Sequence, residues 1–392
     1  MKQAFYDIII LGGGISGLLL GSELSKNHSV LIIEKETKIP TNKFWLTKRN
    51  CILGNEELKS CIDSHLTTLD FIAFDLTTYH CAGDYSLWNT NLLISHLSET
   101  IKARNGAILN THKFYSYYYS NNRITVLANS LEYSASIVID CMGYSSPIIY
   151  AKGIVNIIGY YILHGKVLKL RKEITPIGLS NVMINSRPKY LEVFPLSTGE
   201  AYTILIAPEK SIQSSTNIQK EFEFIVNESS YSQYFVNHQS NPHALWGVIP
   251  VGFLRKRALD NIYFFGEAGQ LNPGTTATCL TKILYSYKKT SEFISTCLKN
   301  KTLTQSDLDR DFSSMNQFNR KFQLHLFQDI LNWNSDDFKK LVVGMNDLGD
   351  NLVNDIIFGE LAHRDILQLG TVSKLLKNQR FFVLKPLLKS II

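Results

Sequence analysis

Three glycines near the N-terminus have the spacing of a phosphate-binding turn. Gly12, Gly14 and Gly17 form the pattern G-x-G-x-x-G and directly follow a largely apolar run at residues 6–11. Such a run predicts a parallel β-strand that is covered on both faces. In this pattern the first glycine permits a tight turn, and the second lets a pyrophosphate approach the backbone. The third lets the following helix pack closely on the strand.

An acidic residue after the second expected strand complements this turn. Residues 29–33 read as that strand, with Glu34 at its end and Lys35 next to it. A carboxylate in this place can accept hydrogen bonds from the hydroxyls of an adenosine ribose, while the N–H groups of Ile15 and Ser16 would face the phosphates. The glycines alone fit the turn of any α/β protein. The order of strand, glycines, helix, strand and acid predicts a dinucleotide-binding βαβ unit.

A second turn with a similar make-up occurs in the middle of the chain. Residues 137–139 read as a short buried strand, and Asp140, Gly143 and Ser145 follow it in the pattern D-x-x-G-x-S. By itself this segment fits an ordinary βα turn.

A third turn follows another expected strand at residues 262–265. Gly266 and Glu267 form this turn, and the segment Pro273, Gly274, Thr275 and Thr276 leads into a helix expected from about Thr276. Glu267 could meet the ribityl chain of a flavin, and backbone N–H groups at a helix start could face its pyrimidine edge. The three turns in this order are far more specific than any one of them.

The order of these segments predicts an α/β protein. We expect an FAD-binding, Rossmann-like domain of the glutathione-reductase type, with an inserted antiparallel substrate-side sheet and a helical C-terminal region. Residues 190–195 and 201–207, joined by a turn at 197–199, read as a β-hairpin of that inserted sheet, and 155–170 is also strand-like. The expected divisions are an FAD-binding domain at 1–40, 90–150 and 245–300, a substrate domain at 41–89 and 151–244, and a helical region at 301–392.

The composition narrows the class of protein. With 45% hydrophobic and 19% charged residues, the chain is neither disordered nor fibrous. It has no apolar run of the roughly 18 residues that a membrane-spanning helix needs. The expected first strand occupies the place of a secretion signal, so we expect a cytoplasmic protein. The six cysteines are widely spaced and predict reduced thiols and no metal site. A net charge of +6 without a basic, aromatic-interleaved patch argues against nucleic acid as a partner.

Residues 371–392 carry basic and apolar side chains and no acid. This mixture suits peripheral contact with an anionic membrane or a partner groove. The alternative is a basic terminal helix that docks on its own domain. The basic residues are Lys374, Lys377, Arg380, Lys385 and Lys389.

These motifs resemble those of a superfamily of FAD-dependent enzymes. It contains aromatic hydroxylases, geranylgeranyl reductases, flavin halogenases and lycopene cyclases. The lycopene cyclase branch is the most similar, on four segments that together cover most of the chain. These are Trp45 in NKFWLTKRN, Trp246-Gly247-Val248-Ile249-Pro250, Gly266-Glu267-Ala268-Gly269 with Asn272-Pro273-Gly274-Thr275, and residues 326–370 with Phe358-Gly359-Glu360-Leu361. The resemblance implies FAD as the cofactor.

Departures from the cyclase pattern argue against cyclase activity. In lycopene cyclases a hairpin strand carries adjacent acids about nine and ten residues after a proline. Counted from Pro195, these places hold Ile204 and Leu205, and only Glu200 and Glu209 flank the strand. Because protonating an alkene needs a positioned acid, a lycopene-type cyclase is disfavoured.

Other branches of the superfamily also match only in part. Thr90 stands where hydroxylases and reductases usually have an FAD-binding arginine. Hydroxylases of this superfamily have an arginine that contacts NADPH near the place where this chain has Ile148 and Ile149. The electron donor could therefore be NAD(P)H or a separate flavin reductase. A halogenase would need a lysine near the flavin, for which Lys43 or Lys48 could be proposed, although surface lysines are common.

The leading hypothesis is an FAD-dependent oxidoreductase of the monooxygenase or reductase type that acts on a hydrophobic or aromatic small molecule in biosynthesis. The alternatives are a cyclase-like isomerase that uses reduced FAD, with Glu192 or Glu200 as its acid, and a flavin-binding protein without turnover. We expect the strand at 202–206, Trp45 and Trp246 to line the substrate face. The catalytic candidates are Trp45, Trp246, His243 and Glu200, each of which could equally be structural.

Overall fold

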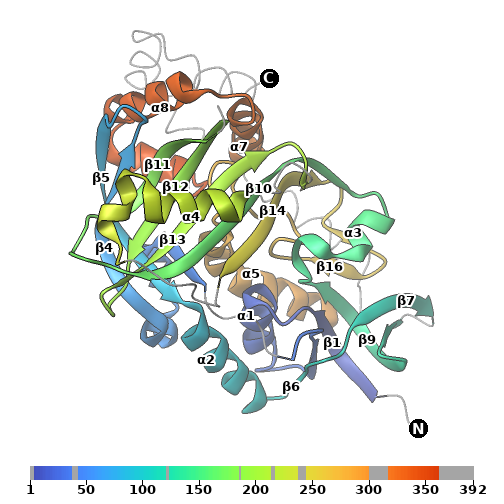
Figure 1. The fold of residues 1–392 in the computed structure, drawn as a ribbon. Helices are drawn as coiled ribbons and strands as arrows, with labels where there is room; N and C mark the ends of the chain where they lie inside the picture. Colours follow the sequence, from blue (N-terminus) through green and yellow to red (C-terminus); the bar gives the residue numbers. More distant parts are fainter. Residues whose placement is uncertain are drawn as a thin grey trace.

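The computed structural model describes residues 4–37, 43–120, 123–184, 187–212, 217–236, 244–299 and 317–361. These residues form two sheets of eight strands each, with helices packed against both (Figure 1). The first sheet is built mainly from the N-terminal third of the chain, and the second combines strands between residues 44 and 89 with strands between 155 and 254.

Parallel strands form the centre of the first sheet, whose path runs β15-β16-β9-β1-β2-β6. The uninterrupted burial of Ile8, Ile9 and Ile10 explains why this segment is apolar on both faces. An antiparallel hairpin, β7 and β8, joins the sheet through β9. The strands are β1 (Ala4–Leu11), β2 (Val30–Ile33), β6 (Gly106–Leu109), β7 (Phe114–Ser120), β8 (Arg123–Ala128), β9 (Leu131–Asp140), β15 (Ala258–Leu259) and β16 (Ile262–Phe264).

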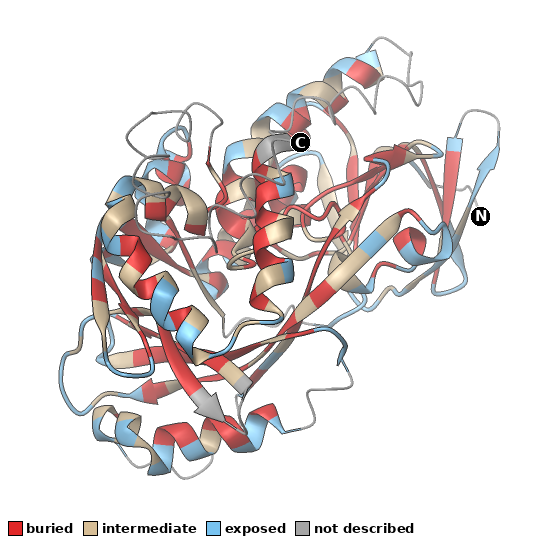
Figure 2. Cartoon of the chain, turned by 90° about the horizontal axis from the view of Figure 1, so that it is seen from above, coloured by how far each residue is buried: buried red, intermediate tan, exposed pale blue. Residues whose placement is uncertain are grey.

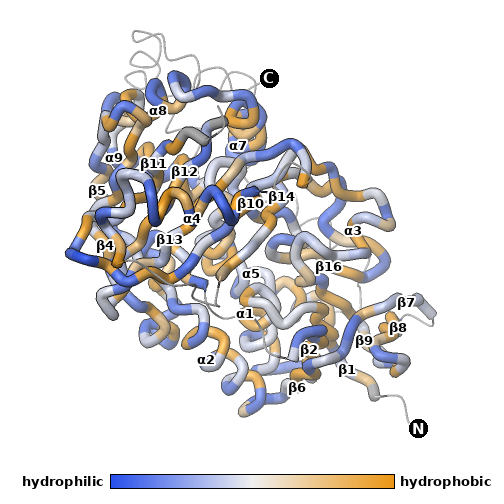
Figure 3. Tube along the Cα trace, in the orientation of Figure 1, coloured by the Kyte–Doolittle hydropathy of each residue, from blue (hydrophilic) through white to orange (hydrophobic). Residues whose placement is uncertain are grey.

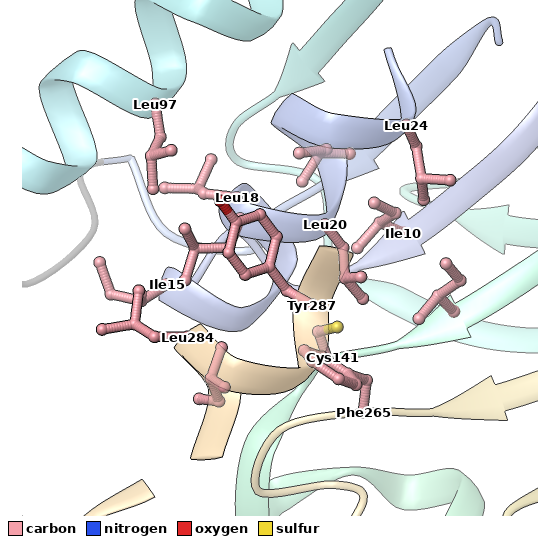
Figure 4. Packing of buried hydrophobic residues seen from close by; sticks show 14 of the residues in the cluster. Ile10, Ile15, Leu18, Leu20, Leu24, Leu97, Cys141, Phe265, Leu284 and Tyr287 are labelled. Carbon is pink, nitrogen blue, oxygen red and sulfur yellow. The ribbon is translucent and has the colours of Figure 1, made fainter. Parts of the chain in front are cut away.

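Three helices cover one face of the first sheet: α1 (Ile15–Leu24), α2 (Thr90–Lys102) and α5 (Cys279–Lys299). Leu18 and Leu20 of α1, Leu97 of α2 and Tyr287 of α5 meet in one apolar cluster with Ile10 (Figure 4). The opposite face is covered by the β7–β8 hairpin and the short helix α3 (Pro147–Ala151). The parallel strands of this sheet therefore lie between two packed layers.

The second sheet has the order β14-β10-β13-β12-β11-β4-β5-β3 and is mostly antiparallel. Only β11 and β4 pair in parallel within it. Its strands are β3 (Phe44–Lys48), β4 (Ile62–Ile72), β5 (Thr78–Asn89), β10 (Val155–Lys169), β11 (Ile177–Ile184), β12 (Arg187–Pro195), β13 (Glu200–Glu209) and β14 (Leu245–Leu254).

Helices cover both faces of the second sheet, and Figure 2 shows the buried residues concentrated between the layers. On the outer face lies α4 (Ile218–Glu228), which packs on Leu191 and Leu205. On the inner face lie α7 (Gln317–Ile330), α8 (Ser335–Leu348) and α9 (Asp350–Ile357). None of the described helices is long and apolar enough to cross a membrane, and hydrophobic and hydrophilic residues are mixed along the labelled helices in Figure 3.

The expected fold class is confirmed: a Rossmann-like parallel sheet, an inserted antiparallel sheet and a helical C-terminal region are all present. The hairpin expected at 190–195 and 201–207 is β12 and β13, with Tyr190 opposite Ile206. One segment differs: residues 245–254, which were expected in the FAD-binding domain, form β14, which pairs with β10 of the second sheet. The basic tail at 371–392 lies outside the described residues.

Candidate functional site

Three loops meet at the carboxyl ends of the parallel strands of the first sheet. They follow β1, β9 and β16, and backbone hydrogen bonds join the strand ends: Cys141 donates to Leu11 at 2.8 Å and Phe265 donates to Asp140 at 3.0 Å. β2 pairs on one side of β1 and β9 on the other. In open α/β sheets this reversal of strand order leaves a crevice at the carboxyl ends, where ligands bind.

Two of the predicted glycines are required by the backbone itself. Gly12 has a φ of +99°, and a Cβ built on it would lie 2.5 Å from the carbonyl oxygen of Cys141. A Cβ on Gly17 would lie 2.1 Å from the carbonyl oxygen of Gly12. The first and third positions of the motif therefore serve the tight turn and the close packing of α1 on β1.

Gly14 differs from these two because no atom lies within 4 Å of a Cβ built on it. It is the N-cap of α1 with a φ of −65°, which other residues can adopt, and no side chain caps the helix. The first turn of α1 also carries no acidic residue. Open space beside an uncapped helix N-terminus fits a phosphate group, because the unpaired N–H groups and the helix dipole favour an anion there. Ile15 and Ser16 form the start of this turn.

Glu34 lies against the glycine turn, at the end of β2. Its Oε2 accepts a hydrogen bond from the N–H of Gly13 at 2.6 Å, and its Oε1 accepts one from the N–H of Glu36 at 2.9 Å. These bonds hold the buried carboxylate beside the turn, where the ribose of a bound dinucleotide is expected. Lys35 points to solvent and lies 3.7 Å from Glu36.

Asp140 organises the loop after β9. Its carboxylate accepts hydrogen bonds from the N–H of Met142 and from the hydroxyl of Ser146. Burial raises the pKa of Asp140 to about 6, although these two hydrogen bonds oppose the rise. The sequence pattern named Ser145, but its hydroxyl donates to the carbonyl of Met142 instead. Gly143, with a φ of +72°, provides the left-handed residue of this loop.

Glu267 connects the third loop to the second. A Cβ on Gly143 would lie 3.2 Å from its Oε2, and the backbone of Tyr144 donates a hydrogen bond to its carboxylate. Burial raises the pKa of Glu267, and the nearby Lys43 charge and the Tyr144 hydrogen bond lower it in part. Lys43 therefore lies near the third loop.

Gly266 brings the third loop against the first. It has a φ of +65°, and a Cβ built on it would lie 2.2 Å from the hydroxyl oxygen of Ser16. The three turns that the sequence indicated are thus in contact: residues 12–17, 140–146 and 266–267.

The segment at 273–276 is held mainly by other protein groups. The N–H and hydroxyl of Thr275 both donate to Oε1 of Gln323 in α7, at 3.0 and 2.7 Å. The hydroxyl of Thr276 donates to the carbonyl of Ile357 in α9 at 2.8 Å. A Cβ on Gly274 would lie 2.3 Å from the carbonyl oxygen of Gln323, so close helix packing explains this glycine.

The helix after this segment begins later than expected. α5 starts at Cys279 rather than near Thr276, because Pro273 accepts the N–H of Ala277 in a turn and Ala277 has a φ of +56°. Contact of Pro273, Gly274, Thr275 and Thr276 with a flavin stays a prediction, and the N–H of Thr275 is occupied by Gln323.

The aromatic candidates do not line the inner face of the second sheet. Trp45 packs against the apolar cluster of the first sheet, and its neighbour Phe44 instead lies 5.5 Å from Tyr202 between ring centroids. Trp246 is 53% exposed, while Leu245 next to it belongs to the inner cluster. Both tryptophans were one residue out of phase with the face that they were expected to line.

Of the two remaining catalytic candidates, only Glu200 lies within the described residues. Glu200 lies at the start of β13, where its carboxylate accepts the hydroxyl of Thr198 in the exposed hairpin turn at 2.9 Å. His243 lies outside the described residues. A catalytic role for any of the candidates stays a prediction.

Lys48 has a structural role in this fold. Its ammonium group donates to Oδ1 of Asp355 and Oε2 of Glu360, both at 2.6 Å. These bonds connect β3 to α9 and to the residues that follow α9.

Thr90, which stands in place of an arginine, donates its hydroxyl to the carbonyl of Lys43 and starts α2.

Three further residues belong to this region but are not among the residues predicted from the sequence: Ser146, Tyr161 and Gln323. Ser146 could have been found as a second hydroxyl next to Ser145. The hydroxyl of Tyr161 lies between the carbonyl oxygens of Gly274 and Thr275, at 2.9 and 2.8 Å. Tyr161 lies in β10 and Gln323 in α7, both far in the sequence from residues 274–275. No local pattern indicates such contacts.

No protein-family model and no curated protein sequence matches the chain. Solved structures do match over nearly its whole length. A geranylgeranyl bacteriochlorophyll reductase-like protein from Thermoplasma acidophilum has a TM-score of 0.75 at 14% identity, over 97% of this chain and 100% of that chain. The p-nitrophenol 4-monooxygenase PnpA from Pseudomonas putida has a TM-score of 0.65 at 12% identity, over 97% and 99%. A variant of halogenase PltM in complex with FAD has a TM-score of 0.61 at 13% identity, over 97% and 85%. The similarity to lycopene cyclases stays a prediction, and the fold of this chain is that of FAD-dependent oxidoreductases.

Proposed function

We propose that this protein is an FAD-dependent oxidoreductase of the monooxygenase or reductase type that acts on a hydrophobic or aromatic small molecule. The observation that carries the proposal is the meeting of three loops at one end of the parallel sheet. There Gly14 leaves open space beside an uncapped helix N-terminus, and the Glu34 carboxylate is held against the same turn.

The residues of these loops fit the parts of FAD. The backbone at Gly14, Ile15 and Ser16 would bind the pyrophosphate, and Glu34 would accept the ribose hydroxyls. Glu267 would lie near the ribityl chain. FAD supplies the transfer of electrons when it is bound, and the protein orients it and keeps water away from the reacting atoms.

The inner face of the second sheet supports an apolar substrate. This face carries Tyr202, Ile204 and Ile206 of β13 beside Tyr161 of β10, and its apolar residues form one cluster with α7, α8 and α9. Tyr161 also contacts the backbone of Gly274 and Thr275, so the substrate-side sheet and the expected flavin-side segment are in direct contact. The positions of the cyclase acid pair hold Ile204 and Leu205, and Leu205 faces the outer cluster.

Absorbance spectroscopy under anaerobic conditions tests the proposal. The purified protein should show a flavin band that disappears with dithionite and returns with oxygen. The same experiment with NADPH, alone and with an added flavin reductase, identifies the electron donor. A protein that takes up no flavin, or whose flavin no donor except dithionite reduces even with aromatic compounds present, would contradict an oxidoreductase.

A further inference from the structure

Glu192 occupies the middle of the inner face of the second sheet. It lies on β12 between Tyr190 and Phe194 of the same face, and it pairs in register with Ile204 of β13. Strand alternation therefore directs its carboxyl toward the same side as these apolar residues. A carboxylic acid at the centre of an apolar face calls for a functional or structural partner.

No protein group within the described part of the chain provides that partner. The Glu192 carboxyl has neither an ion pair nor a hydrogen bond among the described residues, whereas Lys48 and Lys189 each have carboxylate partners. Burial alone raises the pKa of Glu192 to about 8, so the carboxyl is protonated at neutral pH. The side chain keeps some exposure to solvent.

The groups that face Glu192 are aromatic hydroxyls rather than charges. They come from neighbouring strands: Tyr161 of β10, Tyr190 of β12 and Tyr202 of β13. Burial raises the pKa of each tyrosine, and the Glu192 charge adds to the rise. No lysine, arginine or histidine contributes to the pKa shift of Glu192.

Glu192 is also linked to the expected flavin side of the molecule. Tyr161 and Tyr190 have ring centroids 6.1 Å apart, and the hydroxyl of Tyr161 contacts the carbonyl oxygens of Gly274 and Thr275. Tyr161 therefore connects the strand neighbours of Glu192 to the segment that carries Gly274 and Thr275.

We propose that Glu192 donates a hydrogen bond to a neutral oxygen or nitrogen acceptor on an otherwise apolar, aromatic substrate. This inference rests on the proposed function, because it takes the inner face of the second sheet as the substrate side. It deepens that function by naming the substrate class. A flat hydrocarbon without an acceptor leaves the buried donor unpaired, and a cationic substrate gains no ion pair at neutral pH.

Equilibrium dialysis of the purified full chain, with bound FAD measured by absorbance, tests this inference. The probes are quinoline and naphthalene, which share a shape and differ in one ring nitrogen, and 2-naphthylmethylamine as the cation. Wild type should prefer quinoline over naphthalene by about fivefold near neutral pH, the value of one net hydrogen bond. The preference should disappear above about pH 9, because the ionised carboxyl no longer donates.

Two variants separate the donor from the shape of the site. Glu192→Gln keeps a donor and should retain the quinoline preference at every pH, and Glu192→Leu should lose it. Tighter binding of the cation than of quinoline by the wild type, or an unchanged quinoline preference in Glu192→Leu, would overturn the inference. The probes bind without turnover. A flavin that no donor reduces would therefore contradict the proposed function, and the comparison of quinoline with naphthalene would still test the role of Glu192.

Discussion

Replacing Glu192 with leucine should stabilise the fold in a pH-dependent manner. Burial raises the pKa of this carboxyl from 4.5 to about 8 in the folded state, so the native chain holds the proton more tightly than the unfolded chain does. Between these values unfolding releases a proton, and the free energy of unfolding therefore falls as pH rises. Below pH 4.5 the carboxyl is protonated in both states, and its ionisation does not lower the free energy of unfolding. Above about pH 8 it is ionised in both states, and the loss of stability is complete.

The size of the effect follows from the shift. Each pKa unit corresponds to about 1.4 kcal/mol, so a rise from 4.5 to about 8 gives a loss of at most about 5 kcal/mol at alkaline pH. The partial access of the side chain to solvent reduces this figure. Glu192→Leu cannot ionise and should avoid the loss entirely.

Urea unfolding followed by tryptophan fluorescence measures the difference. The midpoint of Glu192→Leu relative to wild type should rise steadily from about pH 5 to about pH 9, with an unchanged slope in urea. Glu192→Gln, which is also neutral, is the matched control and should show the same pH trend. A difference between variant and wild type that is the same at both ends of this pH range would refute the assignment of a protonated Glu192.

Three further changes, one of them with a control variant, test separate features of the protein. Gly17→Ala should lower the free energy of unfolding by several kcal/mol, because its Cβ would overlap the Gly12 carbonyl oxygen at 2.1 Å, and an unchanged urea midpoint would contradict this packing. Lys48→Met should cost about 3 kcal/mol, because it leaves two partly buried carboxylates unpaired. Lys339→Met, which breaks the more exposed pair with Asp75, is its control and should change stability by less than about 1 kcal/mol. If the basic tail binds membranes, removal of residues 371–392 should release the protein from anionic vesicles, and equal binding of both forms would end that hypothesis.

The first sheet and its glycine turn could be predicted from the sequence because their signals lie within one βαβ unit. Gly12 and Gly17 lie in the turn that they shape, and Glu34 directly follows the next strand, β2, 21 residues after Gly13. Buried parallel strands are also visible as apolar runs, as in residues 8–10.

The second sheet was harder to predict because its geometry depends on strand phase and distant partners. A shift of one residue moves a side chain to the opposite face of a strand, so Phe44 rather than Trp45 reaches Tyr202. The contacts of Thr275 with Gln323 join segments 48 residues apart, and the sequence between them carries no pattern that indicates such pairing.

The most direct test of the central claim is a titration of FAD into the wild-type chain and Gly14→Val, each freed of flavin. Gly14 has open space around its Cβ position and an ordinary φ, so the valine should fold with a urea midpoint close to that of wild type. The same side chain would occupy the place of the pyrophosphate, so the account predicts saturable binding of FAD by wild type and none by the variant. Equal binding by both, or no binding by wild type, would contradict an FAD site at this turn.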